Sequence, residues 1–285
     1  MPDEHDDTPL PSRFAIVRRS IWQLVRSGAR RAPADGNYAE DHGPRFFGGR
    51  GEGGAGADAA GALRVVSFNI DHGREVARAA ALLGDDPSLH GADIVLLQEM
   101  EERGTSRIAE SLGMAHVYYP AGRHPVSGRH FGNAVLARGD IVRDTKHLLP
   151  HLGRVRGTRR IAVAATVSVR GRLLTAISVH LATLLDASLE AQRDQLAAVL
   201  DVAEGVETPV VIGGDFNRRA LGLIVERRGY RWLTRDVGPT FGPFAIDHLF
   251  VRGDDRDASH AAGVVRDVRG ASDHRPVWST LKLSG

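Results

Sequence analysis

From residue 63 onward, short runs of apolar and β-branched residues alternate with polar stretches in which apolar residues recur at helical spacing. Short apolar runs bounded by turn residues are typical of buried strands. They predict strands over residues 63–70, 92–99, 132–137, 161–169, 173–181, 209–216 and 246–251, with one more at 276–278. Helical spacing predicts helices over residues 74–83, 104–112 and 188–202. Strands interleaved with helices predict a layered α/β domain.

Residues 1–62 have a different pattern, which predicts a flexible arm in front of a domain that spans residues 63–285. Within it, residues 13–31 carry six arginines and no acidic residue, with apolar residues at helical spacing. Residues 43–61 are glycine-rich and, apart from Phe46 and Phe47, contain no large apolar side chain, which is typical of a tether. The basic amphipathic segment 13–31 could contact an anionic membrane surface or nucleic acid. The alternatives are a short helix packed on the domain and a disordered tail.

The amino-acid composition excludes several classes of protein and of active site. The chain of 285 residues is 42% hydrophobic and 25% charged, so we expect one large domain with a substantial core. The chain contains no run of about 18 apolar residues, so we expect no transmembrane helix. Its first eight residues are acidic and do not resemble a secretory signal. Cysteine is absent, which excludes disulfides, thiolate metal sites and a cysteine nucleophile. We therefore expect a soluble cytoplasmic protein.

Polar residues stand at the ends of the predicted strands. Each one alone is typical of a turn or a helix cap. Strand ends converge on one edge of a sheet in α/β folds, so we expect the set to line a binding site. Carboxylates and amides without sulfur are suited to Mg²⁺, Mn²⁺ or Ca²⁺ rather than zinc. The set comprises Asn69, Glu99, His180, Asp215, Asn217, Asp247, His248, Ser272, Asp273 and His274.

Seven short motifs in a fixed order carry a resemblance to a known family. Each motif alone is weak, but the order and the spacings together are specific. The chain resembles the endonuclease/exonuclease/phosphatase superfamily, which includes pancreatic-type deoxyribonucleases, abasic-site endonucleases, neutral sphingomyelinases and inositol polyphosphate phosphatases. The motifs are SFN (67–69), LLQE (96–99), GNAVL (132–136), SVHL (178–181), GDFN (214–217), IDH (246–248) and SDHRP (272–276).

The resemblance implies a four-layer α/β sandwich, in which two mixed β-sheets pack face to face with helices outside. It also implies a metal site, with Glu99 as the principal ligand of Mg²⁺ or Mn²⁺, aided by Asn69 and Asp273. His274 would lie closest to the phosphorus. Asp247 would accept the other ring proton of His274, which fixes the tautomer of the imidazole.

The remaining motif residues are implied to act on water and on phosphate oxygens. Asp215 would orient or deprotonate the attacking water, and Asn217 would hold that water or a phosphate oxygen. His180 would donate a hydrogen bond to a non-bridging oxygen or protonate the leaving group. Asn133 would bind substrate beside the phosphate, although a turn residue after Gly132 explains it equally well.

The reaction implied is in-line attack of water on a phosphoester, with a divalent metal and without a covalent intermediate. Basic clusters at 123–129 and 154–160 could contact a nucleic acid backbone, so a nuclease or related phosphodiesterase is the favoured interpretation. Solvated loop charge in an arginine-rich chain explains them as well. The alternatives are a sphingomyelinase-like or inositol-phosphate-like phosphoesterase, supported by segment 13–31, and a non-catalytic scaffold that binds a phosphorylated partner.

Overall fold

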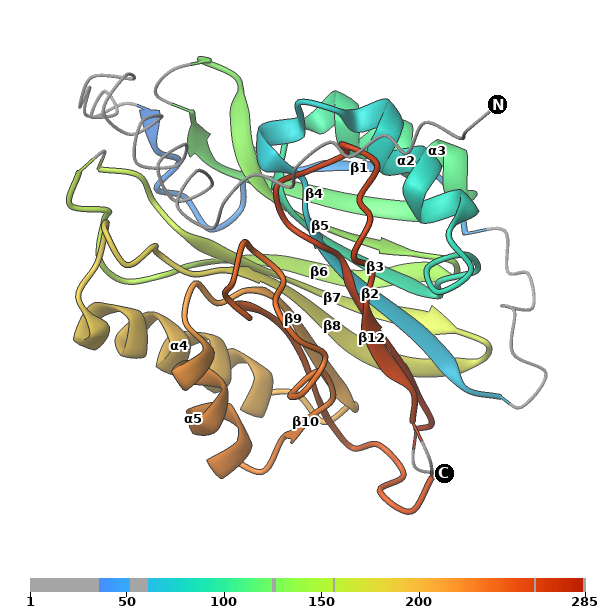
Figure 1. Ribbon diagram of the computed structural model, residues 1–285. Coiled ribbons are helices and arrows are strands. Elements are labelled where there is room, and N and C mark those ends of the chain that lie inside the picture. Colours follow the sequence, from blue (N-terminus) through green and yellow to red (C-terminus); the bar gives the residue numbers. More distant parts are fainter. Residues whose placement is uncertain (1–35, 52–60, 125–126, 156, 259, 284–285) are drawn as a thin grey trace, which may run out of the picture.

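In the computed structural model, two β-sheets lie face to face, and helices cover their outer faces (Figure 1). The structure describes residues 36–51, 61–124, 127–155, 157–258 and 260–283. The basic segment predicted at 13–31 lies outside these residues. In the described part of the chain, no helix has both the length and the apolar character needed to cross a membrane.

The first sheet has seven strands and contains the parallel pair β2 and β3 among otherwise antiparallel neighbours. Asn69 ends β2 and Glu99 lies near the end of β3, so both side chains are carried to the same edge. In spatial order the strands are β1 (Phe46–Gly48), β4 (Ala115–Arg123), β5 (His130–Ala137), β3 (Ile94–Met100), β2 (Leu63–Asn69), β13 (Val277–Leu281) and β12 (Ala262–Val264).

The second sheet has six strands and contains one parallel pair, β8 and β9. His180 ends β8 directly opposite Asp215, which ends β9, and Asp215 lies opposite Asp247 at the start of β11. In spatial order the strands are β10 (Arg231–Trp232), β11 (Asp247–Arg252), β9 (Val210–Asp215), β8 (Arg172–His180), β7 (Ile161–Val169) and β6 (Asp140–Leu148).

Helices follow the strand ends and begin at capping side chains. Glu101 caps α3 (Glu102–Leu112) by accepting hydrogen bonds from the backbone N–H groups of Arg103 and Gly104. Ser188 caps α4 (Leu189–Glu204) by accepting one from Ala191 N–H. Such caps satisfy amide groups that have no partner within the helix. The other helical elements are η2 (Asp71–Gly73), α2 (Val76–Asp85), η3 (Arg219–Leu221) and α5 (Gly222–Arg227).

Three apolar clusters separate the layers, because alternate residues of each strand point to opposite faces. Odd-numbered residues of β2 and β7 and even-numbered residues of β3, such as Val65, Val163 and Leu96, meet between the two sheets. Even-numbered residues of β2 and odd-numbered residues of β3 pack against α2 and α3, and even-numbered residues of β9 pack against α4 and α5. This arrangement confirms the predicted four-layer sandwich of two mixed sheets with helices outside.

Residues 43–51 differ from the predicted glycine-rich tether. Phe46–Gly48 forms β1, which pairs with β4 at one edge of the first sheet. Arg45 donates two hydrogen bonds to Asp144 of β6, and buried Lys146 donates to the carbonyl oxygen of Gly43. The prediction was wrong for this stretch, because Phe46 and Phe47 supply the β-forming residues that glycine content obscured.

Candidate active site

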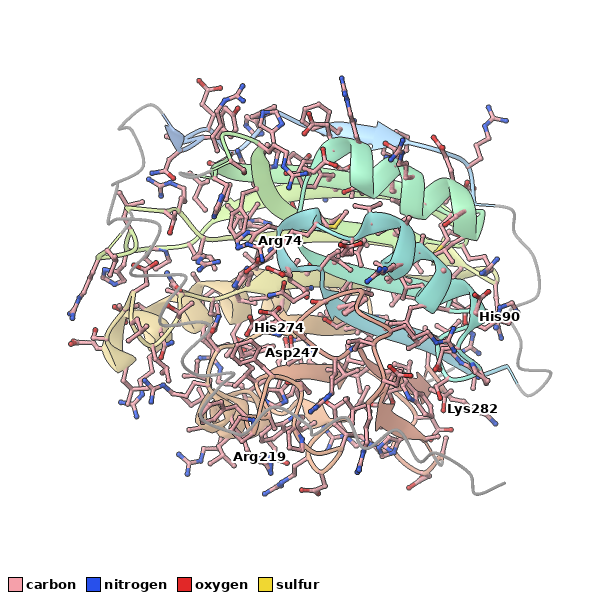
Figure 2. All side chains as sticks on the ribbon, turned by 45° about the horizontal axis from the view of Figure 1, so that its top comes forward. Arg74, His90, Arg219, Asp247, His274 and Lys282 are labelled. Carbon is pink, nitrogen blue, oxygen red and sulfur yellow. The ribbon has the colours of Figure 1, made fainter. Side chains whose placement is uncertain are left out.

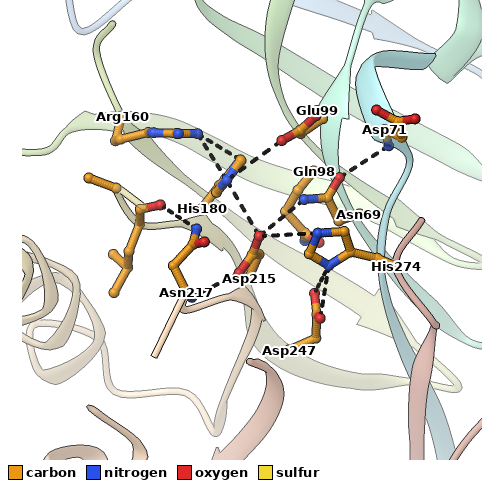
Figure 3. Close-up of polar contacts among 12 residues, drawn as sticks. Asn69, Asp71, Gln98, Glu99, Arg160, His180, Asp215, Asn217, Asp247 and His274 are labelled. Atoms are coloured by element: carbon orange, nitrogen blue, oxygen red, sulfur yellow. Dashed lines mark hydrogen bonds and ion pairs between the residues drawn. The ribbon is translucent and has the colours of Figure 1, made fainter. Parts of the chain in front are cut away.

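Asp215 lies at the centre of a buried polar cluster at the strand ends, and the neighbours that reach it come from both sheets (Figure 3). Asn69 donates a hydrogen bond from Nδ2 to Asp215 Oδ2 at 3.2 Å. Nε2 of His180 lies 3.6 Å from the same oxygen, and Nε2 of His274 lies 3.8 Å from it. The pKa of Asp215 is raised to about 7, first by burial and then by the negative charge of Asp247. Asp215 can therefore exchange a proton near neutral pH.

His274 is held between two carboxylates. Its Nδ1 donates to Asp247 Oδ2 at 3.0 Å, which leaves Nε2 facing Asp215. Its backbone N–H donates to Ser272 Oγ, and the ring of Phe241 lies 4.7 Å from the imidazole. Burial alone would lower the pKa of His274, but the charges of Asp247 and Asp215 outweigh it and raise the pKa well above the usual range. His274 and Asp247 lie side by side near the middle of the molecule (Figure 2).

Glu99 is displaced from the regular strand by an irregularity in the ladder. The register between β3 and β5 shifts between Leu97 and Met100, and Glu99 has a φ of 58°. A left-handed conformation is unfavourable for a residue with a long side chain, and such residues cluster at functional sites. The Glu99 carboxylate accepts a hydrogen bond from His72 N–H at 3.1 Å, and His180 Nε2 lies 3.8 Å from Oε1.

Asp71 and Asp273 bring two more carboxylates next to Glu99, and this crowding of negative charge fits a bound cation. The pKa of Asp71 is raised, first by burial and then by the negative charges of Asp273 and Glu99. Asp273 is exposed on the rim, and the loss of water around its carboxyl group is the main cause that raises its pKa. Ligand atoms of Asp71, His72 and Glu99 lie within 4.8 Å of one another. A divalent cation with oxygen ligands would neutralise this charge.

His180 is fully enclosed and lies against a buried arginine. Nη1 of Arg160 lies 2.9 Å from His180 Nε2 and 3.0 Å from Nδ1. Burial, followed by the positive charge of Arg160, lowers the pKa of His180 well below the usual range. The guanidinium also lies over the ring of Phe131, at 5.6 Å from its centroid. His180 is therefore a neutral imidazole, and Arg160 brings the positive charge at this position.

Asn217 is fixed by its own neighbours in the loop after β9. Its backbone N–H donates to Asp215 Oδ1 at 2.8 Å, and its Nδ2 donates to the carbonyl oxygen of Leu181 at 2.9 Å. Its φ of 54° is left-handed, a conformation that asparagine tolerates better than most residues. The amide nitrogen is thus engaged by the backbone, so the side-chain oxygen is the atom that would contact water.

Asn133 of β5 donates hydrogen bonds across to the second sheet. Its side chain is 2% exposed, and its Nδ2 donates to the carbonyl oxygens of Ile161 at 3.0 Å and Ser178 at 3.3 Å. Both acceptors belong to the opposite sheet. The side-chain nitrogen of Asn133 therefore joins the two sheets, and the role of Asn133 in binding substrate stays a prediction.

A second buried link between the sheets runs beneath the cleft, and the sequence analysis assigned no role to its residues. Gln98, one residue before Glu99, donates from Nε2 to Ser178 Oγ at 3.0 Å. Ser178 in turn donates to the carbonyl oxygen of Leu97, back in the first sheet. These two side chains are fully buried, so their hydrogen bonds hold the sheets in register.

The structure brings most of the predicted residues together. Eight lie within hydrogen-bond or ion-pair contact of another member of the set, whereas Asp273 lies on the rim and Asn133 beneath the site. The eight are Asn69, Glu99, His180, Asp215, Asn217, Asp247, Ser272 and His274. The sequence analysis missed Asp71, His72 and Phe131, and it named Arg160 only as part of a basic cluster.

Comparison with known families agrees with this geometry. The sequence model of the Endonuclease/Exonuclease/phosphatase family matches residues 66–274, which include every residue of the polar cluster. The chain belongs to the endonuclease/exonuclease/phosphatase family. Members of this family are generally phosphoester hydrolases and typically depend on a divalent metal. None of the curated proteins compared by sequence matches the chain.

Solved structures show the same fold at low sequence identity. An endonuclease/exonuclease/phosphatase from Bacteroides vulgatus is 20% identical with a TM-score of 0.62, covering 78% of this chain and 99% of its own. A humanized D. rerio TDP2 is 17% identical with a TM-score of 0.60, covering 78% and 100%. The mannosyl-6-phosphatase Bt3783 from Bacteroides thetaiotaomicron is 20% identical with a TM-score of 0.57, covering 77% and 99%. At these identities the likeness establishes the fold alone.

Proposed function

We propose that this protein is a divalent-metal-dependent phosphoester hydrolase that acts on phosphodiesters by in-line attack of water. The observation that carries the proposal is the position of Asp215, with His180, His274 and Asn69 around one of its oxygens at 3.2–3.8 Å. A carboxylate that titrates near neutral pH among hydrogen-bond donors suits the activation of water. Cysteine is absent from the chain, so a cysteine nucleophile is excluded.

Glu99, Asn69 and Asp273 would hold the metal, with Asp71 and His72 close enough to contribute. The oxygen-rich donor set suits Mg²⁺ or Mn²⁺, and Ca²⁺ is also compatible with it. When bound, the cation supplies positive charge to a phosphoryl oxygen and to the negative charge that develops in the transition state.

Asp215 would orient the attacking water and accept its proton, because its pKa of about 7 allows both protonation states near neutral pH. The side-chain oxygen of Asn217 would hold the same water, since the Asn217 backbone N–H already fixes Asp215 Oδ1. Asp215 ends β9 and Asn217 follows it by two residues, so the water would be positioned from one strand end.

His274 would stabilise a phosphoryl oxygen as an imidazolium, and Asp247 would keep its Nε2 directed into the cleft. Two roles were open for His180, a hydrogen bond to a non-bridging oxygen or protonation of the leaving group. Its lowered pKa favours the first, because a neutral imidazole can donate one hydrogen bond but is a poor acid.

Nucleic acid is the first phosphodiester to test. Arg123 is exposed at the end of β4, and Arg129 and Arg154 are exposed on loops. Arg129 donates to the carbonyl oxygen of His72 beside Glu99. Arginines in such positions neutralise backbone phosphates. A lipid phosphodiester is the second candidate, because leucines are exposed on two loops next to His180.

The test is hydrolysis by the purified protein of plasmid DNA, sphingomyelin vesicles and bis(4-nitrophenyl) phosphate, each with Mg²⁺ and with a chelator. We expect metal-dependent hydrolysis of the chromogenic diester and of one natural substrate. The His274→Ala variant should lose activity while remaining folded. Intact metal binding without hydrolysis of any diester would favour the scaffold interpretation and contradict the proposal.

A further inference from the structure

Four leucines project into solvent next to the catalytic cleft. Leu152 lies on the loop between β6 and β7, Leu184 and Leu185 lie on the loop between β8 and α4, and Leu189 begins α4. Their exposed fractions are 46%, 53%, 59% and 37%. Arg160 directly precedes β7 and His180 ends β8, so both loops lie next to these residues. Figure 1 shows the two loops together at the left of the molecule. We call these four side chains the leucine rim.

The leucine rim is held by hydrogen bonds between its two loops. The backbone N–H groups of Arg154 and Val155 donate to Asp186, at 2.8 Å to its carbonyl oxygen and 2.9 Å to Oδ1. Gln195 of α4 donates to the carbonyl oxygen of Pro150 at 3.0 Å and accepts from Ala182 N–H at 2.9 Å. The leucines are therefore exposed on a fixed framework, and a cluster of exposed apolar side chains typically marks an interaction site.

Two exposed arginines next to the leucine rim can contact phosphates of a partner, and one of the two acidic residues nearby is paired. Arg154 and Arg193 are exposed on the same loop and on the first turns of α4. The acidic residues exposed nearby are Glu190 and Asp194, and Asp194 is engaged by His151 Nε2 at 2.7 Å. A nucleic acid duplex offers phosphates but no apolar surface that leucines could enter. An anionic lipid bilayer offers acyl chains for leucines and phosphates for arginines.

We propose that the leucine rim docks on an anionic lipid bilayer and turns the catalytic cleft toward the lipid headgroups. The leucines enter the boundary between headgroups and acyl chains, while Arg154 and Arg193 contact lipid phosphates. Docking itself does not require hydrolysis. In combination with the proposed function, on which this step rests, it would bring a lipid phosphodiester to Asp215.

Vesicle binding by the full chain tests the proposal, with co-sedimentation on phosphatidylcholine vesicles with and without phosphatidylglycerol. The double variant Leu184→Ser/Leu185→Ser should bind phosphatidylglycerol vesicles about tenfold more weakly, since each leucine loses its apolar transfer. The matched control is Leu173→Ser, because Leu173 is 50% exposed at the opposite end of β8 from His180. All three proteins should melt at the same temperature, because none of these leucines is buried.

The outcomes separate docking from catalysis. No binding by the wild-type chain, or equal binding by the double variant and wild type, would overturn the proposal. Self-association that is lost only in the double variant would assign the leucine rim to a second copy of this chain and also overturn it. Hydrolysis of bis(4-nitrophenyl) phosphate should be equal in all three proteins. Its absence in wild type would contradict the proposed function and leave the docking result unaffected.

Discussion

His274 donates a hydrogen bond from Nδ1 to Asp247 Oδ2 at 3.0 Å, and this contact leaves the opposite ring nitrogen facing Asp215. Asp247 begins β11 and His274 comes from the loop before β13, so the pair joins the two sheets at the cleft. The orientation of the imidazole ring of His274 thus depends on Asp247, a residue that need not touch substrate.

Replacing Asp247 with asparagine should keep the fold but lower kcat about 100-fold or more, because asparagine allows the wrong tautomer of His274 and removes the charge that raises its pKa. The measurement is kcat and KM for bis(4-nitrophenyl) phosphate across pH. Asp144→Asn is the matched control, since buried Asp144 contacts Arg45 and Tyr119 instead. An Asp247→Asn variant with wild-type turnover would remove the proposed role of the pair.

Replacing Glu99 with glutamine should weaken Mg²⁺ and Mn²⁺ binding roughly tenfold or more, because a carboxylate in a cluster of acids becomes neutral. Isothermal titration calorimetry with each metal measures the change directly. Glu102→Gln is the control, because Glu102 contacts His130 Nδ1 at 2.7 Å. Equal metal affinity in the two variants would place the cation elsewhere.

Replacing Asn133 with alanine should destabilise the protein by about 1–3 kcal/mol, because it removes the donor shared by two buried carbonyl oxygens. The free energy of unfolding in urea gives this value. KM for the chromogenic diester should stay unchanged, since Asn133 lies beneath the cleft. A stable variant with a raised KM would restore the substrate role predicted from the sequence.

His248 should make stability depend on pH. Burial lowers the pKa of His248 to about 3. Between that value and the ordinary pKa near 6.5, the unfolded chain binds a proton that the folded chain does not, so stability falls as pH falls. His248→Phe removes this contribution and should add about 2 kcal/mol at pH 5 relative to pH 8. Urea unfolding of both proteins at the two pH values tests it, and parallel pH curves would contradict it.

Deleting residues 1–60 should lower Tm by roughly 5 °C or more, because the deletion removes β1, the contacts of Arg45 with Asp144, and the acceptor of Lys146. A chain that begins at residue 36 is the matched control, since it keeps all of these contacts. Thermal unfolding followed by circular dichroism compares the two. Equal Tm values would show that residues 36–51 contribute nothing to stability.

The elements with strong apolar patterns could be predicted from the sequence, and the edge elements could not. β6 has mostly exposed or half-exposed residues between Asp140 and Leu148, so no alternation marks it. β4 is buried over most of its length, but Pro120 and Gly122 interrupt its pattern. In the candidate site, the order of motifs predicted Glu99 and Asp215 in one cleft. The position of Asn133 beneath it depends on side-chain direction across two sheets, which no local pattern reports.

Gln98 and Ser178 tie the two halves of the sandwich together one residue before Glu99 and two residues before His180. The groups that would perform the reaction come from both halves. Rotating one sheet away from the other to widen the cleft would therefore break these buried hydrogen bonds. We therefore expect a phosphate-binding site whose geometry is already formed before the ligand binds. Under the proposed function, no movement of one sheet toward the other is then required in each catalytic cycle.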